Sequence, residues 1–357
     1  MAFVFAACRP GSEALLKREV ARLRPDLRLA FSRPGFVTFK DPDLFGGDVD
    51  WMDPAALPSV FARVRGLSLG RAGTSGPDPA LRGQAVVEAA RRLAGAGRLR
   101  LHVFARDAED PREDAAFDPQ AREALQAIRA AAGDADPFLP DPVAQPGDTV
   151  LDVAVIAPDE WWFGAHRHAA VRSPFPGGRP PLALPADAPS RAWLKLEEAL
   201  LWTGAPVQAG DCAVEIGSAP GGASFALLNR GVSVWGVDPA AMDPRVQSFA
   251  GPARFVHVRR PMAMVRPKDL PRDVRWLFVD VNEGPEATVP EIEHLVPVLA
   301  PSLRGVFLTV KANRVEVADR IPSLVQRFLR LGLRDVRAAQ LSFHHREFLL
   351  AGFPGGR

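Results

Sequence analysis

The sequence AVEIGSAPGGASFALLNRGVSVWGVD, residues 213–238, predicts a strand, a glycine-rich turn, a helix, a second strand and a carboxylate, in that order. Val214 and Ile216 give the first segment the apolar pattern of a buried strand. Glycines in the turn let the backbone bend sharply and approach a ligand closely. Asp238 follows the second apolar run, where nucleotide-binding α/β folds place the acid that accepts hydrogen bonds from ribose hydroxyls. The stretch therefore predicts a site for a cofactor that contains a nucleoside.

The glycine-rich turn lacks the features that bind phosphate groups. A dinucleotide fingerprint has a second glycine that makes room for a pyrophosphate, but Ala219 stands at that position and its Cβ would crowd the phosphates. The chain also lacks the G-x-x-x-x-G-K-S/T motif of a P-loop. S-adenosylmethionine needs the turn and the ribose acid but carries no phosphate, so it fits best. A dinucleotide site and a purely structural glycine turn are the alternatives.

Composition predicts an ordinary globular protein of the cytoplasm. Of the 357 residues, 47% are hydrophobic and 24% are charged. No apolar run reaches the roughly 18 residues that cross a bilayer, so we expect no membrane partner. The two cysteines, Cys8 and Cys212, provide neither a disulfide framework nor a metal cluster, which indicates a reducing compartment. Because the formal net charge is only +2, any basic surface for a nucleic acid must be local.

The pattern along the chain predicts an α/β protein with several domains. Residues 172–189 contain six prolines and two glycines, which is typical of an extended linker. Repeated strand-then-helix segments follow it and predict a Rossmann-like fold with a mostly parallel, doubly wound sheet. Two smaller α/β regions precede it. The predicted boundaries are 1–45, 46–170, 171–189 for the linker, and 190–357.

Four charged residues fall at comparable places in the predicted C-terminal fold. They are Lys195 in the first helix, Asp280 and Lys311 at the ends of successive core strands, and Glu347 at the start of the last strand. Doubly wound sheets bind ligands at the carboxyl ends of their strands, so these side chains should gather over the cofactor. Only five of the 44 basic residues are lysines, and lysine, unlike arginine, can lose its proton in a protein. The alternative interpretation is a structural network of buried salt bridges.

These segments resemble the motifs of the FtsJ-type RNA 2′-O-ribose methyltransferases. The resembling segments are SRAWLKLEE, VEIGSAPGG, VDPAAMDP, LFVD, TVK and HREF. The closer resemblance is to the RlmM-type bacterial methyltransferases of cytidine in 23S ribosomal RNA, to which ACRPGSE, WFGAHRHAAVRSPFPGG and SFHHRE are also similar. The resemblance covers most of the chain and is dense after Trp161, whereas residues 46–150 match only in pattern.

The resemblance implies an S-adenosylmethionine-dependent enzyme that acts as a monomer on large-subunit ribosomal RNA. Residues 1–45 would be a ferredoxin-like unit and residues 46–170 a THUMP-like RNA-binding domain. The catalytic tetrad would be Lys195, Asp280, Lys311 and Glu347. The cofactor pocket would be lined by Ser190, Gly217, Ser218, Ala219, Pro220, Gly221, Gly222, Asp238 and Asp280. An RNA-binding ribosome-assembly protein with an inactive methyltransferase fold is the alternative from another functional class.

One segment departs from the family. After its third strand the family usually carries an acid near the adenine, but residues 258–264 read VRRPMAM, and neither Arg260 nor Pro261 offers a carboxylate. Backbone groups would then contact the adenine, or cofactor affinity would be lower.

Ribose methylation explains the residue types of the tetrad. A ribose hydroxyl is a poor nucleophile that must lose its proton as the methyl group arrives, and a general base supplies about 10²- to 10⁴-fold in rate. Lys311 is the candidate base, with Lys195 and burial lowering its pKa and the two carboxylates raising it. Two roles stay open for Lys311: removing the proton or only orienting the hydroxyl.

Other chemistries fit less well. Carbon-5 methylation of a pyrimidine needs a cysteine nucleophile, but Cys212 begins a predicted strand and Cys8 lies in another domain. Amino methylation commonly uses an Asn/Asp-Pro-Pro-aromatic motif, which residues 280–285 lack. The His-x-His at 166–168 and the His-His at 344–345 have no third ligand at a suggestive spacing, so we expect no metal site.

RNA contact is predicted for a local cluster of basic and aromatic residues, since arginine and aromatic faces hold phosphates and unstacked bases. The cluster consists of Trp161, Trp162, His166, Arg167, His168, Arg172 and Arg179, with His344 and Arg346 beside the tetrad. The alternative is that the tryptophans belong to the core and the arginines are merely solvated.

Overall fold

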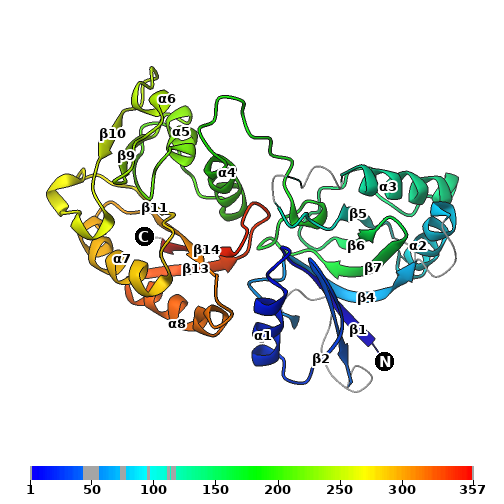
Figure 1. The fold of residues 1–357 in the computed structure, drawn as a ribbon. Coiled ribbons are helices and arrows are strands. Elements are labelled where there is room, and N and C mark those ends of the chain that lie inside the picture. The colour runs from blue at the N-terminus through cyan, green and yellow to red at the C-terminus, as the bar shows by residue number, and fades with distance from the viewer. Residues whose placement is uncertain are drawn as a thin grey trace. The chain divides into compact units, whose positions relative to one another are not determined.

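The computed structural model describes residues 2–42, 56–72, 78–94, 97–110, 113 and 118–355. The chain forms two compact units, Met1–Pro181 and Leu182–Arg357 (Figure 1). The predicted boundary between residues 45 and 46 lies outside the described residues. None of the described helices is both long and apolar enough to span a bilayer.

The first unit is a seven-stranded sheet with strand order β2-β3-β1-β4-β7-β6-β5. β5 and β6 pair in parallel, and the other neighbours pair antiparallel. Its elements are β1 (Ala2–Ala7), α1 (Glu13–Leu23), β2 (Arg28–Arg33), β3 (Phe36–Asp41), β4 (Val64–Ala72), α2 (Pro79–Ala94), β5 (Arg100–Ala105), α3 (Asp118–Ala132), η3 (Gly133–Ala135), β6 (Thr149–Ala157), β7 (Glu160–Arg167) and η4 (Pro176–Gly178).

Alternation along the strands divides the side chains of this sheet between two faces. Leu151 and Val153 point to one face, where they pack with Val86 of α2 and Ile128 of α3. Figure 1 shows α2 and α3 side by side over that part of the sheet. The opposite face carries a smaller apolar cluster that includes Phe104. η4 packs so closely against it that a Cβ on Gly177 would come within 2.9 Å of the Phe104 ring.

The second unit is also built on seven strands, in the order β10-β9-β8-β11-β12-β14-β13. All neighbours are parallel except β14, which runs antiparallel to both β12 and β13. Its elements are α4 (Ala192–Thr203), β8 (Cys212–Ile216), α5 (Gly222–Asn229), β9 (Ser233–Val237), α6 (Pro244–Gln247), β10 (Phe255–Val258), η5 (Met262–Met264), η6 (Pro267–Asp269), β11 (Trp276–Val279), α7 (Pro285–Leu299), β12 (Gly305–Lys311), α8 (Val317–Arg330), β13 (Leu333–Ala339) and β14 (Glu347–Pro354). The predicted Rossmann-like, mostly parallel sheet is confirmed.

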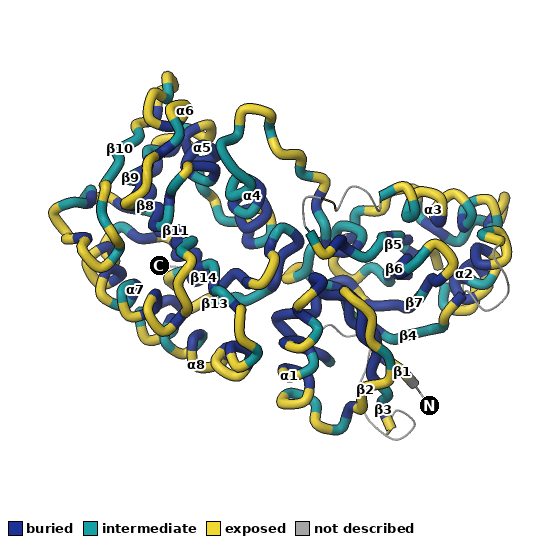
Figure 2. The backbone as a smooth tube through the Cα atoms, viewed as in Figure 1, coloured by how far each residue is buried: buried dark blue, intermediate teal, exposed yellow. Residues whose placement is uncertain are grey.

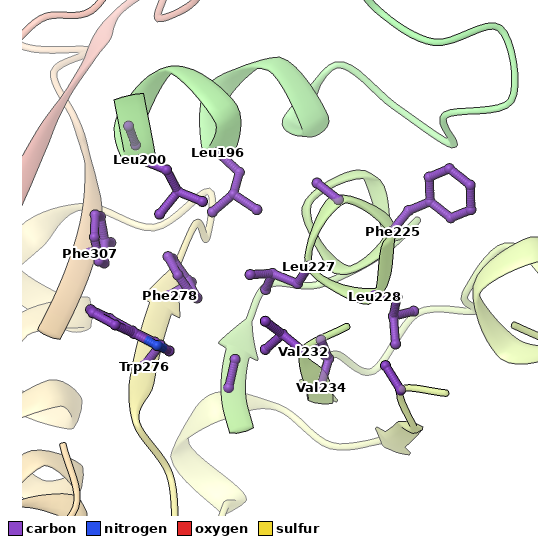
Figure 3. Packing of buried hydrophobic residues seen from close by; sticks show 14 of the residues in the cluster. Leu196, Leu200, Phe225, Leu227, Leu228, Val232, Val234, Trp276, Phe278 and Phe307 are labelled. Carbon is purple, nitrogen blue, oxygen red and sulfur yellow. The ribbon is translucent and has the colours of Figure 1, made fainter. Parts of the chain in front are cut away.

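The core of the second unit forms where α4 and α5 cover the central strands. Leu196 and Leu200 of α4 point toward Phe278 and Phe307, whose ring centroids are 4.8 Å apart (Figure 3). Trp276 lies at the base of this cluster and donates a hydrogen bond to Asp211 at 2.8 Å. Figure 2 shows the inner strands β8 and β11 as buried tube between more exposed helices. This packing holds the strand ends, and the side chains that follow them, in fixed positions.

Candidate active site

β8 lies at the centre of the second sheet, at the point where the order of the strands reverses direction. From β8 the chain passes to β9 on one side, whereas β11 lies on the other. Doubly wound folds bind their ligands at this kind of reversal. Gly217 follows β8 with φ +81°, and a Cβ there would lie 2.3 Å from the carbonyl oxygen of Asp280. The close approach of the two strand ends therefore requires glycine.

The rest of the turn is shaped by the starts of α4 and α5. Gly221 has φ +116°, a conformation that side chains rarely adopt. A Cβ on Gly222 would lie 2.3 Å from Oγ of Ser190, so the two helix starts touch at this glycine. The hydroxyl of Ser218 is buried and lies 3.5 Å from Sδ of Met242. The hydroxyl of Ser218 is therefore not open to a ligand in this structure.

Asp238 reaches the turn from the end of β9, as its place in the sequence predicted. Its Oδ2 accepts a hydrogen bond from the amide of Ala219 at 3.0 Å, and its Oδ1 accepts one from the amide of Ala240 at 2.8 Å. Each carboxylate oxygen has a further lone pair for an incoming hydroxyl. The carboxylate is thus fixed beside the glycine turn.

The structure brings the four charged residues together in a closed square of ion pairs, which we call the tetrad. Lys195 Nζ lies 3.0 Å from Asp280 Oδ2 and 2.6 Å from Glu347 Oε1. Lys311 Nζ lies 2.8 Å from Asp280 Oδ1 and 2.6 Å from Glu347 Oε2. Each carboxylate bridges both ammonium groups, and each ammonium group contacts both carboxylates. The side chains keep 8% to 26% of their surface exposed, so the tetrad is accessible from solvent.

Electrostatic interactions within the tetrad favour the charged forms of Lys311 and Glu347. Burial lowers the pKa of Lys311, but the attraction of Asp280 and Glu347 outweighs it, so that this pKa is raised. Burial raises the pKa of Glu347, but His344, Lys195 and Lys311 lower it to about 2. At neutral pH Lys311 is therefore an ammonium group and Glu347 a carboxylate.

Glu215 and His344 are buried beside the tetrad, and with Lys195 and Asp280 they line a small cavity of about 40 Å³. Burial, together with the carboxylates of Asp280 and Asp238, raises the pKa of Glu215 to about 8, although Ser224 donates a hydrogen bond to it. Burial also lowers the pKa of His344 to about 4. Both groups are therefore mostly uncharged at neutral pH. Sequence reasoning missed Glu215, although an acid inside the apolar run VEI was the available signal.

Glu198 connects the helix of Lys195 to the loop that precedes Glu347, and sequence reasoning missed this too. Its carboxylate is 3% exposed and accepts hydrogen bonds from the amide and hydroxyl of Ser342 and the amide of Phe343, at 2.6 to 2.9 Å. Glu198 lies one helical turn after Lys195, so a second carboxylate in SRAWLKLEE was the signal. The contact ties α4 to the start of β14.

The predicted RNA-contact cluster is wrong for four of its members. Trp161, His166, His168 and His344 are 1% to 4% exposed, so their side chains cannot reach an RNA in this structure. Trp161 and Trp162 are neighbours in β7 and point to opposite faces, and only Trp162 keeps partial exposure. Within the described ranges, no group of three or more His, Cys, Asp or Glu side chains is placed to hold a metal ion.

Comparisons with known proteins point to ribosomal RNA methyltransferases. No family model matches the chain. The chain is 27% identical over 364 residues to the ribosomal RNA large subunit methyltransferase M of Tolumonas auensis, which covers 95% of this chain and 92% of that protein. It is 32% identical over 214 residues to the protein of that name from Musicola paradisiaca (57% and 56% covered), and 37% identical over 146 residues to that from Alkalilimnicola ehrlichii (37% and 39%). Likeness to the solved structure of TrmN from Thermus thermophilus is low, with a TM-score of 0.36 at 20% identity over 99% of this chain and 100% of that chain.

Proposed function

We infer that the chain is a methyltransferase of the RlmM type, and we propose that it transfers a methyl group from S-adenosylmethionine to the 2′-hydroxyl of a cytidine ribose in 23S ribosomal RNA. One observation carries the proposal: two lysines and two acids form a closed square beside the glycine turn of a Rossmann-like sheet. The similarity to large-subunit ribosomal RNA methyltransferases over 95% of the chain supports the substrate class.

The residues at the turn fit the proposed cofactor. Asp238 would accept hydrogen bonds from ribose hydroxyls, and the backbone of residues 217–222 would contact the adenosyl group. Ser190 and Asp280 flank the turn and would complete the pocket. When bound, the cofactor supplies an electrophilic methyl group on a sulfonium. No acid stands at position 260, and the nearby Asp269 pairs with Arg260 at 3.3 Å, so the adenine would rely on backbone contacts.

Lys311 is the residue we propose to act on the ribose hydroxyl. Asp280 and Glu347 fix the direction of its ammonium group, so it can orient the hydroxyl oxygen by donating a hydrogen bond. To remove the proton, it must first become neutral, and its raised pKa opposes this before substrate binds. Nearby positive charge acts in the other direction and favours proton loss. Lys311 therefore orients the hydroxyl while it is an ammonium group. It can take the hydroxyl proton only after releasing its own proton to solvent, which the positive sulfonium of a bound cofactor would favour.

The proposal extends to the rest of the chain. Residues 46–170 would serve as a THUMP-like RNA-binding module behind a ferredoxin-like unit of residues 1–45. The protein would act as a monomer in the cytoplasm, with large-subunit ribosomal RNA as its partner and without a metal ion.

Methyl transfer from tritiated S-adenosylmethionine to undermodified ribosomal RNA tests the proposal. We expect label in the large-subunit RNA, and digestion to nucleosides should place it in 2′-O-methylcytidine. Label in a base, or in another nucleoside, would contradict ribose methylation of cytidine. Binding of RNA and cofactor without any transfer to naked RNA or to assembling particles would favour an inactive assembly protein.

A further inference from the structure

The sheet of the first unit leaves part of one face open as a groove. Its volume is about 560 Å³, within the range of ligand sites in proteins. The groove crosses β2, β3, β1, β4 and β7, which are neighbours in the sheet. It is lined by Phe3, Ala30, Phe31, Thr38, Leu67, Ser68, Leu69, Gly70, Arg71 and Trp162. We call these residues the sheet groove.

Cross-strand pairing explains why these side chains share one face. Phe3 of β1 is paired with Lys40 of β3 and with Ser68 of β4, and directly opposed residues point to the same side. A β-bulge then shifts the register of β4, so that Arg71 is paired with Trp162. The two residues therefore lie together at the same end of the groove.

Aromatic rings form the floor of the sheet groove and remain partly exposed. The centroids of the Phe31 and Trp162 rings are 4.8 Å apart, with 34° between the ring planes. The buried ring of Phe36 supports Trp162 from 5.6 Å, and the indole N–H donates to Glu160 at 3.0 Å. Phe3 is 38% exposed. The indole is thus fixed in place while the groove keeps aromatic surface open to a ligand.

Positive charge surrounds these rings. The guanidinium of Arg71 lies 5.7 Å from the Trp162 centroid, and that of Arg33 lies 5.6 Å from the Phe31 centroid. Both pair with Glu160, a buried acid, at 3.3 and 3.9 Å. Lys40 and Arg28 add two more positive charges in cross-strand positions on the same face. Among the residues that the structure describes on this face, these four basic groups and the carboxylate of Glu160 leave an excess of positive charge around an aromatic floor.

We propose that the sheet groove binds unpaired nucleotides of the RNA substrate, with a base stacked on Trp162 and Phe31 and its phosphates beside Arg71 and Arg33. Unpaired bases are recognised by stacking on aromatic and guanidinium planes, and basic groups bind the backbone. An apolar partner surface would not need the basic groups, and a simple polyanion would not need the rings. The inference rests on the proposed function for its partner but assigns a site that the tetrad does not include.

Binding measurements on the full chain, without cofactor, test the groove. The probes are an unstructured single-stranded RNA octamer and an octamer of the same length without bases. We expect Trp162→Ala to weaken binding of the RNA by about 10- to 100-fold and to leave binding of the abasic probe unchanged. Trp162→Phe should retain most of the affinity because it keeps an aromatic face. Equal affinity of the Trp162→Ala protein for RNA would overturn the proposal.

Two arginine substitutions keep the test valid if Trp162→Ala impairs folding. Arg71→Ala should weaken both probes and reduce the salt dependence of binding, because it removes one phosphate contact. Its matched control is Arg92→Ala, since Arg92 is 70% exposed on α2, which packs on the opposite face of the sheet. Equal effects of the two changes would contradict a site in the groove.

Further outcomes separate this inference from the proposed function and from a protein partner. Methyl transfer is measured in parallel. Groove-dependent RNA binding without any methyl transfer would reject the proposed function alone. Methyl transfer by the wild type, together with groove variants that bind RNA as tightly as the wild type, would reject the groove alone. Sedimentation tests a second copy as the occupant. A dimer that Trp162→Ala dissociates, with RNA affinity unchanged, would make the groove a protein interface and overturn the proposal.

Discussion

Each unit gathers ionisable side chains around carboxylate oxygens. In the first unit the cluster is buried against the sheet, and in the second it is partly exposed where strands of the sheet end. In the first unit, Asp152 lies 2.5 Å from His166 and 3.7 Å from His102, and all three side chains are 1% to 5% exposed. In the second, the tetrad follows strand ends, and Lys195 and Asp280 are about a quarter exposed. A similar grouping of charges therefore has two environments.

The difference shows what each cluster can do. A sealed cluster cannot meet a substrate, so its interactions contribute to the stability of the fold. An open cluster beside a glycine turn can exchange one of its contacts for a substrate hydroxyl. We therefore expect changes in the tetrad to affect activity with little effect on stability, and changes around Asp152 to do the reverse.

The largest effect should come from Lys311→Arg in the tetrad. Arginine keeps the positive charge but cannot lose its proton, and its planar group cannot take the place of Nζ between two carboxylates. We expect methyl transfer to fall by about 10²- to 10⁴-fold, with cofactor binding and the melting temperature close to wild type. Single-turnover experiments measure the rate of methyl transfer, and thermal unfolding measures the melting temperature. Wild-type turnover would remove Lys311 from the mechanism.

Asp152→Ala should give the converse result. Burial raises the pKa of Asp152, but His166 and His102 lower it to about 2, so the carboxylate stabilises the fold. Its contribution is present above pH 4 and is lost as the pH falls toward 2. Removing it should cost about 3 kcal/mol in unfolding free energy at pH 7. Denaturant unfolding measures the loss, with Asp152→Asn as the isosteric control. A fully stable Asp152→Ala protein would show that the sealed cluster has no structural role.

The raised pKa of Glu215 predicts that its contribution to stability depends on pH with the opposite sign. Its folded pKa of about 8 lies above the ordinary value of 4.5, so its contribution to stability is present below pH 4.5 and is lost as the pH rises to 8. Glu215→Gln stays neutral. Between pH 5 and pH 8 its unfolding free energy should therefore fall by on the order of 3 kcal/mol less than that of the wild type. Unfolding at both pH values gives the difference, and parallel pH profiles would mean that Glu215 is already ionised in the fold.

Glu198 should give the smallest effect, and it affects both quantities. Glu198→Gln keeps one oxygen acceptor but loses the charge that accepts three hydrogen bonds. We expect a cost of about 1 to 2 kcal/mol in stability and a roughly tenfold lower kcat with an unchanged KM, because Glu347 is less well positioned. Glu197→Gln is the matched control, because the neighbouring carboxylate on the same helix pairs with Arg230 and not with the loop before Glu347. The same fall in kcat for both variants would argue against a positioning role.

Sequence reasoning predicted the tetrad because strand ends can be located from the pattern of apolar residues. Asp280 and Lys311 come directly after, or end, buried parallel strands, and parallel strands present their carboxyl ends at one edge. Faces of a strand are harder to predict. Trp161 and Trp162 are equally aromatic, and only tertiary packing decides that Trp161 meets α2 and α3. Glu198 and Glu215 lie inside helix and strand patterns, and an acid among apolar residues signals burial there but does not identify the distant partner that binds it.

The placement of β14 between β12 and β13 also has a consequence for synthesis of the protein. Glu347 begins β14, so the ribosome must add the last described strand before the fourth corner of the square exists. The first unit, with its open groove, leaves the ribosome much earlier. On the functions proposed for the sheet groove and the tetrad, a nascent chain would bind RNA before it could methylate it, and a chain that stops before residue 347 would only bind RNA.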